Sequence, residues 1–227
     1  MSAERAIEAR LAEEGVDPEL AGRLAAYGAL LLEATRTVNL TAARTATALV
    51  PHLLDALTLR PFVRGPIVDV GAGGGLPGIP LALASGQSVT LIEAVAKKAE
   101  FLERAVASLG LDGGVRNGRA EALAHEPSLR GRFLAATARA VGAAPTVAEL
   151  TLPFLAPRGV ALLQRGAMDA RERTAVVDAA LMLGGTLIEE RQLDGERRIL
   201  ILEKQADTPS KYPRRTGVPA KRPLCYD

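Results

Sequence analysis

The sequence predicts a doubly wound α/β fold, with a helical extension before the sheet and an antiparallel hairpin at one sheet edge. From about residue 61, short β-prone runs alternate with amphipathic runs of helix length, which is typical of a parallel sheet with helices on both faces. Residues 1–60 contain helix-like segments only. Near the end, two β-prone runs flank Asp194-Gly195, a dipeptide that favours a hairpin turn. The 227 residues, 48% of them apolar, are enough to bury one full core.

The N-terminal extension, residues 1–60, is predicted to be helical. Asp17 supplies an N-cap for a helix whose first turn contains Pro18 and Glu19. The apolar face of this helix contains Leu20, Leu24, Leu31 and Leu32. A turn at residues 39–41 then separates it from a second apolar segment at residues 46–59.

The core, residues 61–203, is predicted to contain parallel strands joined by helices. Strands are expected at residues 67–70, 88–92, 115–117, 133–137 and 160–164. Helices are expected near residues 77–85, 96–109, 120–126, 146–153 and 169–183. The hairpin strands are expected at 186–193 and 197–203. Because the carboxyl ends of parallel strands meet at one edge of the sheet, we expect the ligand crevice there.

Residues 204–227 form a basic, proline-rich C-terminal tail. The chain has a formal charge of +2, whereas residues 204–222 alone carry +5, so the basic character lies at one end. Pro209, Pro213, Pro219 and Gly217 predict that the tail forms no regular helix or strand and lies extended on the surface.

Composition argues against several classes of protein. Apolar runs are interrupted well before the roughly 18 residues that a membrane span needs, and residues 1–10 carry charges instead of an apolar signal core, so we expect a cytoplasmic protein without membrane partners. Cys225 is the only cysteine, which excludes an internal disulfide and a cysteine metal cluster. His52 and His125 are the only histidines and stand far apart, so we expect no metal site.

The densest feature of the sequence is the segment 68–80, VDVGAGGGLPGIP, which holds five glycines and two prolines among thirteen residues. Pro80 does not allow a helix to begin before about Leu76, so residues 71–75 must form a sharp loop between strand and helix. Such a loop has little side-chain bulk, and a ligand can approach its backbone beside the helix N-terminus. The sequence therefore places the ligand crevice at this loop.

The glycine spacing favours S-adenosylmethionine as the ligand. Residues 69–75 read acid-x-Gly-x-Gly-x-Gly, with Asp69 at the head and Gly71 and Gly73 as the first glycines. Asp69 either holds loop amides or faces the amino group of the ligand. A dinucleotide is one alternative, because residues 73–78 also match G-x-G-x-x-G, but Leu76 stands where a fingerprint starting at Gly71 needs its third glycine. A purely structural turn is the other alternative.

Further candidates follow the next strands. Glu93 ends the second strand, 22 residues after Gly71, where a carboxylate accepts both ribose hydroxyl hydrogens; an ordinary acid at a helix start is the alternative. Ala120 and Glu121 stand just beyond the third strand, where an adenine edge would meet a backbone amide and an acid, or else they begin a solvated helix. Arg139 ends the fourth strand and either faces the reacting groups or caps the sheet.

These residues resemble the signature of the bacterial small-subunit rRNA guanine-N7 methyltransferases, the glucose-inhibited division protein B family. The resemblance extends over nearly the whole chain and is most specific in VDVGAGGGLPGIPLAL at residues 68–83. Other matching segments are Asn39-Leu40-Thr41, His52-Leu53-Leu54-Asp55, Leu91-Ile92-Glu93, Gly118-Arg119-Ala120-Glu121, Asp194-Gly195-Glu196-Arg197-Arg198 and the ending at residues 211–224.

The resemblance implies a class I S-adenosylmethionine-dependent methyltransferase with a Rossmann-like sheet, acting on N7 of a guanosine in 16S rRNA near the decoding region. It implies that Glu93 contacts the ribose and that other cofactor contacts lie at Gly71, Leu76, Ala120, Glu121 and Arg139. The implied partner is small-subunit rRNA or the 30S particle, and we expect a monomer. The alternatives are a methyltransferase of the same fold that acts on a small molecule or protein, and a noncatalytic RNA-binding module.

The implied chemistry needs no base, because N7 of guanine already exposes a lone pair. We therefore expect a positioning mechanism without a dedicated catalytic residue, Arg139 being the one candidate; positioning supplies roughly 7–11 kcal/mol in favourable cases. Tyr212 is expected to stack on a base. RNA phosphates are expected to bind the tail cations Lys211, Arg214, Arg215, Lys221 and Arg222.

The chain departs from the family pattern at two places. Ala56 follows the aspartate of His-x-x-Asp, where the family usually has serine, and Arg165-Gly166 replaces lysine-glycine after the fifth strand. Arg165 keeps the charge but not the compact geometry of lysine. His52 and Asp55 either reach the crevice or form a local pair on a helix.

Overall fold

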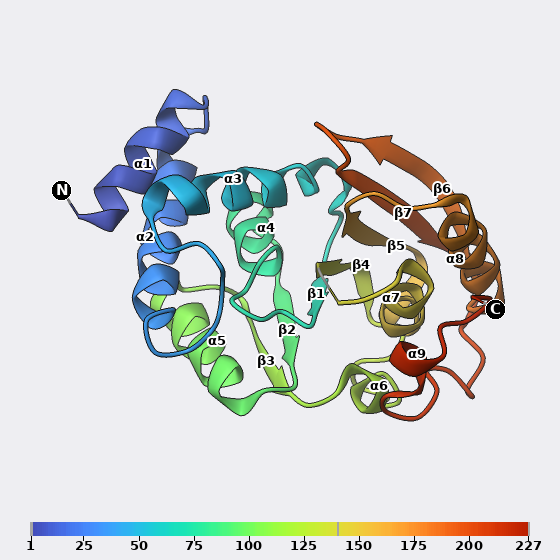
Figure 1. The fold of residues 1–227 in the computed structure, drawn as a ribbon. Coiled ribbons are helices and arrows are strands. Elements are labelled where there is room, and N and C mark those ends of the chain that lie inside the picture. The colour runs from blue at the N-terminus through green and yellow to red at the C-terminus, as the bar shows by residue number, and fades with distance from the viewer. Residues whose placement is uncertain (1, 140, 227) are drawn as a thin grey trace.

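A computed structural model describes residues 2–139 and 141–226 of the chain and shows a mixed sheet between two helical layers (Figure 1). The described residues form a seven-stranded sheet in the order β3-β2-β1-β4-β5-β7-β6. The strands are β1 (Ile67–Val70), β2 (Val89–Glu93), β3 (Gly113–Asn117), β4 (Phe133–Arg139), β5 (Leu155–Arg165), β6 (Gly185–Gln192) and β7 (Arg198–Lys204). β1 to β5 run parallel, and β6 and β7 form an antiparallel hairpin whose second strand pairs with β5. The predicted fold class is confirmed.

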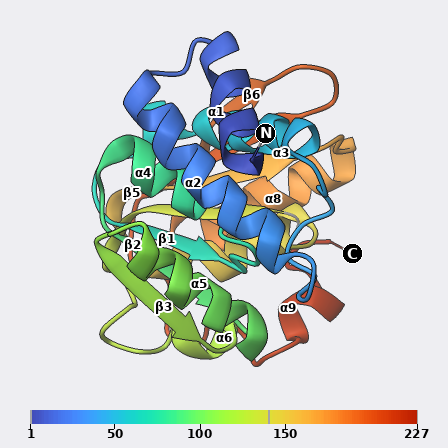
Figure 2. The same cartoon turned by 90° about the vertical axis from the view of Figure 1, so that its left-hand side faces the viewer.

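One face of the sheet is covered by the N-terminal helices together with α4 and α5. These elements are α1 (Ala3–Glu13), α2 (Pro18–Ala34), α3 (Ala46–Leu57), α4 (Gly78–Ser85) and α5 (Ala96–Ser108). Figure 2 looks onto this layer, with α1, α2 and α5 in front of the strands. The helix predicted from Asp17 begins as expected, because the Asp17 carboxylate accepts the Leu20 amide hydrogen at 3.1 Å and Pro18 occupies the first turn. The extension therefore shares one hydrophobic core with the sheet.

The other face of the sheet is covered by the later helices. They are α6 (Ala120–Leu123), α7 (Ala144–Thr151), α8 (Ala170–Met182) and α9 (Val218–Lys221). Elsewhere in the chain, short 3-10 turns precede β1, at Arg60–Phe62, and β5, at Leu152–Phe154. β5 begins five residues before the predicted strand, at Leu155. Leu155 pairs with Phe133 across a register shift, so that the turn-like stretch at 156–159 remains in the strand as an irregularity.

The prediction of an extended surface tail is wrong. Residues 218–221 form α9, and Tyr212 and Leu224 are only 5% and 7% exposed and belong to the core on the second face of the sheet. Side chains of the domain satisfy the backbone of this segment: the Arg130 guanidinium donates to carbonyl oxygens of residues 124, 208, 209 and 212. Specific polar contacts thus order a segment whose content of proline and charged residues is typical of irregular chain.

None of the described helices is long and apolar enough to cross a membrane. Within the same residues, no group of three or more histidine, cysteine, aspartate or glutamate side chains is arranged to hold a metal ion.

Candidate functional site

The glycine loop joins β1 to α4 and contains glycines of two kinds. At Gly73, which has φ of +57°, the nearest atom to an added Cβ would be the Gly71 carbonyl oxygen at 3.8 Å, so this backbone faces open space. At Gly78 an added Cβ would lie 2.7 Å from the Asp69 side chain, so this glycine allows α4 to pack closely on β1. Leu76 is buried at the end of the loop. The first part of the loop can thus receive a ligand, while the second part anchors the helix.

Asp69 supports this loop from inside the protein. Its side chain is 1% exposed, and its carboxylate accepts hydrogen bonds from the Gly78 amide at 3.0 Å and the Thr137 hydroxyl at 2.9 Å. Burial raises the pKa of Asp69 to about 6, although both hydrogen bonds lower it. Asp69 was expected either to hold loop amides or to face the amino group of the ligand, and in the structure it holds the Gly78 amide.

Glu93 lies directly beside the open part of the loop. It is buried at the end of β2, and its carboxylate accepts the Gly73 amide hydrogen at 2.9 Å and the Val95 amide hydrogen at 2.8 Å. The second bond corresponds to the acid at a helix start, because Val95 precedes α5. The first bond joins the two strongest candidates of the sequence, Gly73 and Glu93, at the carboxyl edge of the sheet.

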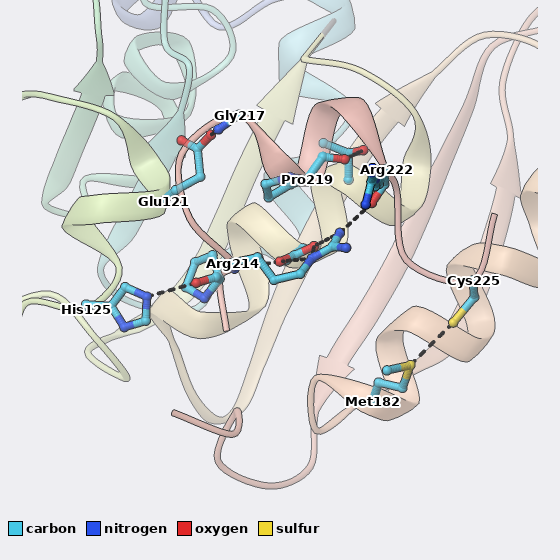
Figure 3. Close-up of polar contacts among 11 residues, drawn as sticks. Glu121, His125, Met182, Arg214, Gly217, Pro219, Arg222 and Cys225 are labelled. Carbon is cyan, nitrogen blue, oxygen red and sulfur yellow. Dashed lines mark hydrogen bonds and ion pairs between the residues drawn. The ribbon is translucent and has the colours of Figure 1, made fainter. Parts of the chain in front are cut away.

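Ala120 and Glu121 begin α6, next to the end of β3. One Glu121 carboxylate oxygen accepts the Gly217 amide hydrogen at 3.0 Å (Figure 3). The same oxygen accepts an Arg119 guanidinium hydrogen, also at 3.0 Å. Burial pushes the pKa of Glu121 upward, but these hydrogen bonds outweigh burial and hold the pKa below its ordinary value. Glu121, one of the two residues predicted to meet the adenine edge, is therefore in contact with the C-terminal tail. The sequence did not indicate this contact.

Arg139 lines a cleft of about 670 Å³. Leu40, which also lines this cleft, lies next to Gly74 of the glycine loop. Asp55, from α3, forms ion pairs with Arg139 at 4.0 Å and with Arg197 at 2.8 Å. The pKa of His52 is lowered, mainly by burial and also by the neighbouring positive charge of Arg139, although the negative charge of Asp55 raises it. The cleft is lined by Leu40, Thr41, Ala42, His52, Asp55, Arg139, Gly142, Gln164, Arg165, Gly166, Leu193, Arg197 and Arg198. His52 and Asp55 thus reach the crevice.

Unpaired polar atoms gather in the wall of this cleft. Within the described ranges, the buried side-chain nitrogen and oxygen atoms without a hydrogen-bond partner are Gln164 Oε1, Arg165 Nε and Arg198 Nε. The Gln164 amide nitrogen donates to the Asp55 carbonyl oxygen at 2.7 Å, which fixes its orientation. Arg165, the replacement for the family lysine, pairs with Glu172 at 2.5 Å. Because buried polar atoms are normally paired, these atoms indicate a surface that accepts a polar ligand.

No sequence motif pointed to Gln164, Arg197 or Arg198, which line the cleft. Arg198 lies opposite Arg165 because β7 pairs with β5, a neighbour relation that follows from the placement of the hairpin and not from any local motif. The adjacent arginines after Asp194-Gly195 were the available signal.

The predicted RNA-binding cations of the tail lie in two settings. Lys211, Arg215, Lys221 and Arg222 are exposed, whereas the Arg214 guanidinium pairs with the buried Glu149 at 2.7 Å. Tyr212 is buried, so the prediction that it stacks on a base is wrong.

The comparisons with known proteins show the family of the chain. The family model described as rRNA small subunit methyltransferase G matches residues 21–200. The chain is 44% identical to the Ribosomal RNA small subunit methyltransferase G of Rubrobacter xylanophilus over 86% of this chain and 81% of that protein. It is 39% identical to the protein of the same name from Deinococcus deserti, over 90% of this chain and 88% of that protein.

Solved structures show the same fold at low identity. A geranyl diphosphate methyltransferase in complex with sinefungin matches with a TM-score of 0.56 and 16% identity, over 67% of this chain and 78% of that one. A putative RNA methyltransferase from Pyrococcus horikoshii matches with a TM-score of 0.53 and 12% identity, over 71% of this chain and 86% of that one. The fold is that of the class I S-adenosylmethionine-dependent methyltransferases, and the chain belongs to the rRNA small subunit methyltransferase G family.

Proposed function

We propose that this protein transfers a methyl group from S-adenosylmethionine to N7 of a guanosine in small-subunit rRNA, near the decoding region. The observation that carries the proposal is the contact between Gly73 and Glu93, an open glycine backbone and a buried carboxylate 2.9 Å apart, beside an arginine-lined cleft. One part of the site thus suits a nucleoside with a ribose, and the other suits a polar base. We further propose that the protein acts as a cytoplasmic monomer on rRNA or the 30S particle.

The residues present fit the cofactor. Glu93 would exchange its bond from the Gly73 amide for the ribose hydroxyls, and Gly73 would leave its backbone open to the ligand, with the exposed Gly71 beside it. The Ala120 amide and Glu121 would meet the adenine edge. When bound, the cofactor supplies an electrophilic methyl group on a sulfonium.

The chemistry asks the protein for alignment. The cofactor would supply the methyl group and keep the electrons of its broken sulfur–carbon bond, and the N7 lone pair would form the new bond, so the positive charge would move to the guanine. No proton has to be removed in this step. Gln164 Oε1 offers an acceptor and Arg165 and Arg198 offer donors, a combination that matches the N–H groups and O6 of guanine. The exposed tail cations would bind phosphates.

The test is transfer of radiolabelled methyl to small-subunit rRNA or subunits from a strain that lacks the methyltransferase, followed by nucleoside analysis. We expect label in 7-methylguanosine with the unaltered protein, loss of label with Glu93→Ala, and retention with Glu100→Ala, a matched change at an exposed position of α5. Cofactor binding without label in any form of the RNA would overturn the proposed substrate.

A further inference from the structure

The C-terminal segment 206–226 touches the proposed cofactor site at one point. The Gly217 amide donates to Glu121, the residue that we propose for the adenine side of the cofactor, and Gly217 has φ of +81°, so the chain turns at this contact (Figure 3). With the segment in place Glu121 is 3% exposed, so its carboxylate depends on donors of the protein. The position of this turn decides whether the carboxylate is fully satisfied.

An internal ion pair fixes the chain just before the turn. Glu149, on α7, has no exposed surface, and its carboxylate accepts the backbone amide hydrogen of Arg214 at 2.7 Å and the guanidinium hydrogens of Nε and Nη2 at 3.0 and 2.7 Å. The same guanidinium donates to the Arg222 carbonyl oxygen at 2.6 Å, which closes the segment on itself. A buried carboxylate that loses such a partner carries a large desolvation cost, so this pair holds residue 214 firmly.

α7 also fixes the chain just after the turn. The Thr146 hydroxyl donates to the Pro219 carbonyl oxygen at 2.9 Å, two residues beyond Gly217. The turn is thus held from both sides by one helix, and its free edge faces Glu121 (Figure 3). Neither contact involves the arginine-lined cleft.

We propose that segment 206–226 forms a wall of the cofactor site and that Arg214 is a positioning residue for the cofactor, acting through Glu149 and Gly217. The inference rests on the proposed function, because it assigns Glu121 to the cofactor. When the segment is docked, Glu121 receives the Gly217 amide and keeps its position. When the segment is released, Glu121 loses a donor and the wall opens, so the cofactor binds only the docked fraction of the molecules.

The test compares Arg214→Gln with Arg104→Gln, which makes the same change of charge at an exposed position of α5. If the docked fraction falls to about a tenth, the apparent Kd for S-adenosylmethionine rises about tenfold, since the apparent Kd equals the intrinsic Kd divided by the competent fraction. We expect the Kd and the KM for the cofactor to rise in Arg214→Gln and Arg214→Lys to recover part of the affinity. Equal cofactor affinity for the two glutamine variants, with a released tail in Arg214→Gln, would overturn the inference.

Hydrogen exchange on the unaltered protein gives an answer that does not depend on the folding of a variant. We expect saturating S-adenosylmethionine to slow amide exchange in residues 214–219, and exchange unchanged by bound cofactor would reject the wall. Absence of cofactor binding by the unaltered protein would instead overturn the proposed function, so the two failures are distinguishable.

Discussion

The two ends of the chain cover opposite faces of the sheet by different physical means. The N-terminal layer, α1 to α3, is held by apolar packing, with Leu24, Leu31, Leu49 and Leu53 fully buried against the core. The C-terminal segment 206–226 is held mainly by hydrogen bonds and an ion pair, from Arg130, Glu149 and other side chains of the domain. Both ends reach the candidate site, one at the glycine loop and the other at Glu121.

This difference explains why the sequence predicted one end and not the other. Apolar residues at helical spacing repeat every few positions, so a local window contains the whole signal for the N-terminal layer. Glu149 and Arg214 are 65 residues apart, and no local sequence pattern around either residue identifies the other as its partner. A charge-rich, proline-rich segment therefore resembles a disordered tail until the fold brings its partners together.

The largest expected effect comes from breaking the apolar end with Leu53→Ala. Leu53 is fully buried, and removing such a side chain costs roughly 2–5 kcal/mol of unfolding free energy through lost burial and the remaining cavity. Urea unfolding measures the change. Leu181→Ala, at an exposed position of α8, is the control and should shift the free energy by less than about 0.5 kcal/mol. A loss below about 1 kcal/mol for Leu53→Ala would show that α3 does not belong to the shared core.

A second prediction concerns Asp69, which lies under the loop between the two ends. Its pKa is raised from 3.8 to about 6, so between these pH values the folded protein binds more protons than the unfolded chain. The resulting stabilisation is fully present below about pH 3.8 and is lost as the pH rises to about 6. At about 1.36 kcal/mol per pKa unit, this amounts to roughly 3 kcal/mol.

Asp69→Asn removes this titration while the amide oxygen can still accept the Gly78 hydrogen bond. We expect the unfolding free energy of Asp69→Asn, relative to the unaltered protein, to rise by roughly 2 kcal/mol between pH 4 and pH 6. Urea unfolding across this range measures the difference. Asp178→Asn removes an exposed carboxylate on α8 and serves as the control. A constant difference for Asp69→Asn would contradict the raised pKa.

The third prediction tests the polar end with Arg130→Met. The variant removes a charged donor from the carbonyl oxygens of residues 208, 209 and 212, and hydrogen bonds to charged groups contribute about 1.5–3 kcal/mol. Because these bonds hold one segment, we expect faster amide exchange and proteolysis in residues 206–226, with a small change in global unfolding. Arg132→Met, at an exposed position two residues away, is the control. Unchanged tail protection would show that the apolar anchors and the Glu149–Arg214 ion pair hold the segment without Arg130.

The residues of the candidate site also fall into two groups, those that the sequence predicts and those that depend on contacts between distant segments. Gly73 and Glu93 were predicted together because the ends of adjacent parallel strands meet at one edge, a rule that needs only the order of elements. Arg198 was not predicted, because it reaches the cleft through the pairing of β7 with β5, which the hairpin sequence leaves undetermined. Glu121 was predicted from its place after β3, but its bond to Gly217 depends on the ordered tail.

The smallest expected effect comes from Tyr27→Phe, which removes the polar contact between the N-terminal layer and the glycine loop. The buried Tyr27 hydroxyl donates to the Gly74 carbonyl oxygen at 2.7 Å, and burial raises the pKa of the phenol, so it remains a donor. Loss of one such bond costs about 1 kcal/mol. Since the loop also carries Gly73, we expect cofactor affinity to fall a few-fold along with stability, measured by urea unfolding and calorimetric titration. Tyr226→Phe, a half-buried position in the tail, is the control for loss of a hydroxyl. A stability loss with unchanged cofactor affinity would mean that the apolar packing of the N-terminal layer supports the glycine loop without this hydrogen bond. The N-terminal layer would then act on the site through apolar contacts alone, in contrast to the polar contacts of the C-terminal segment.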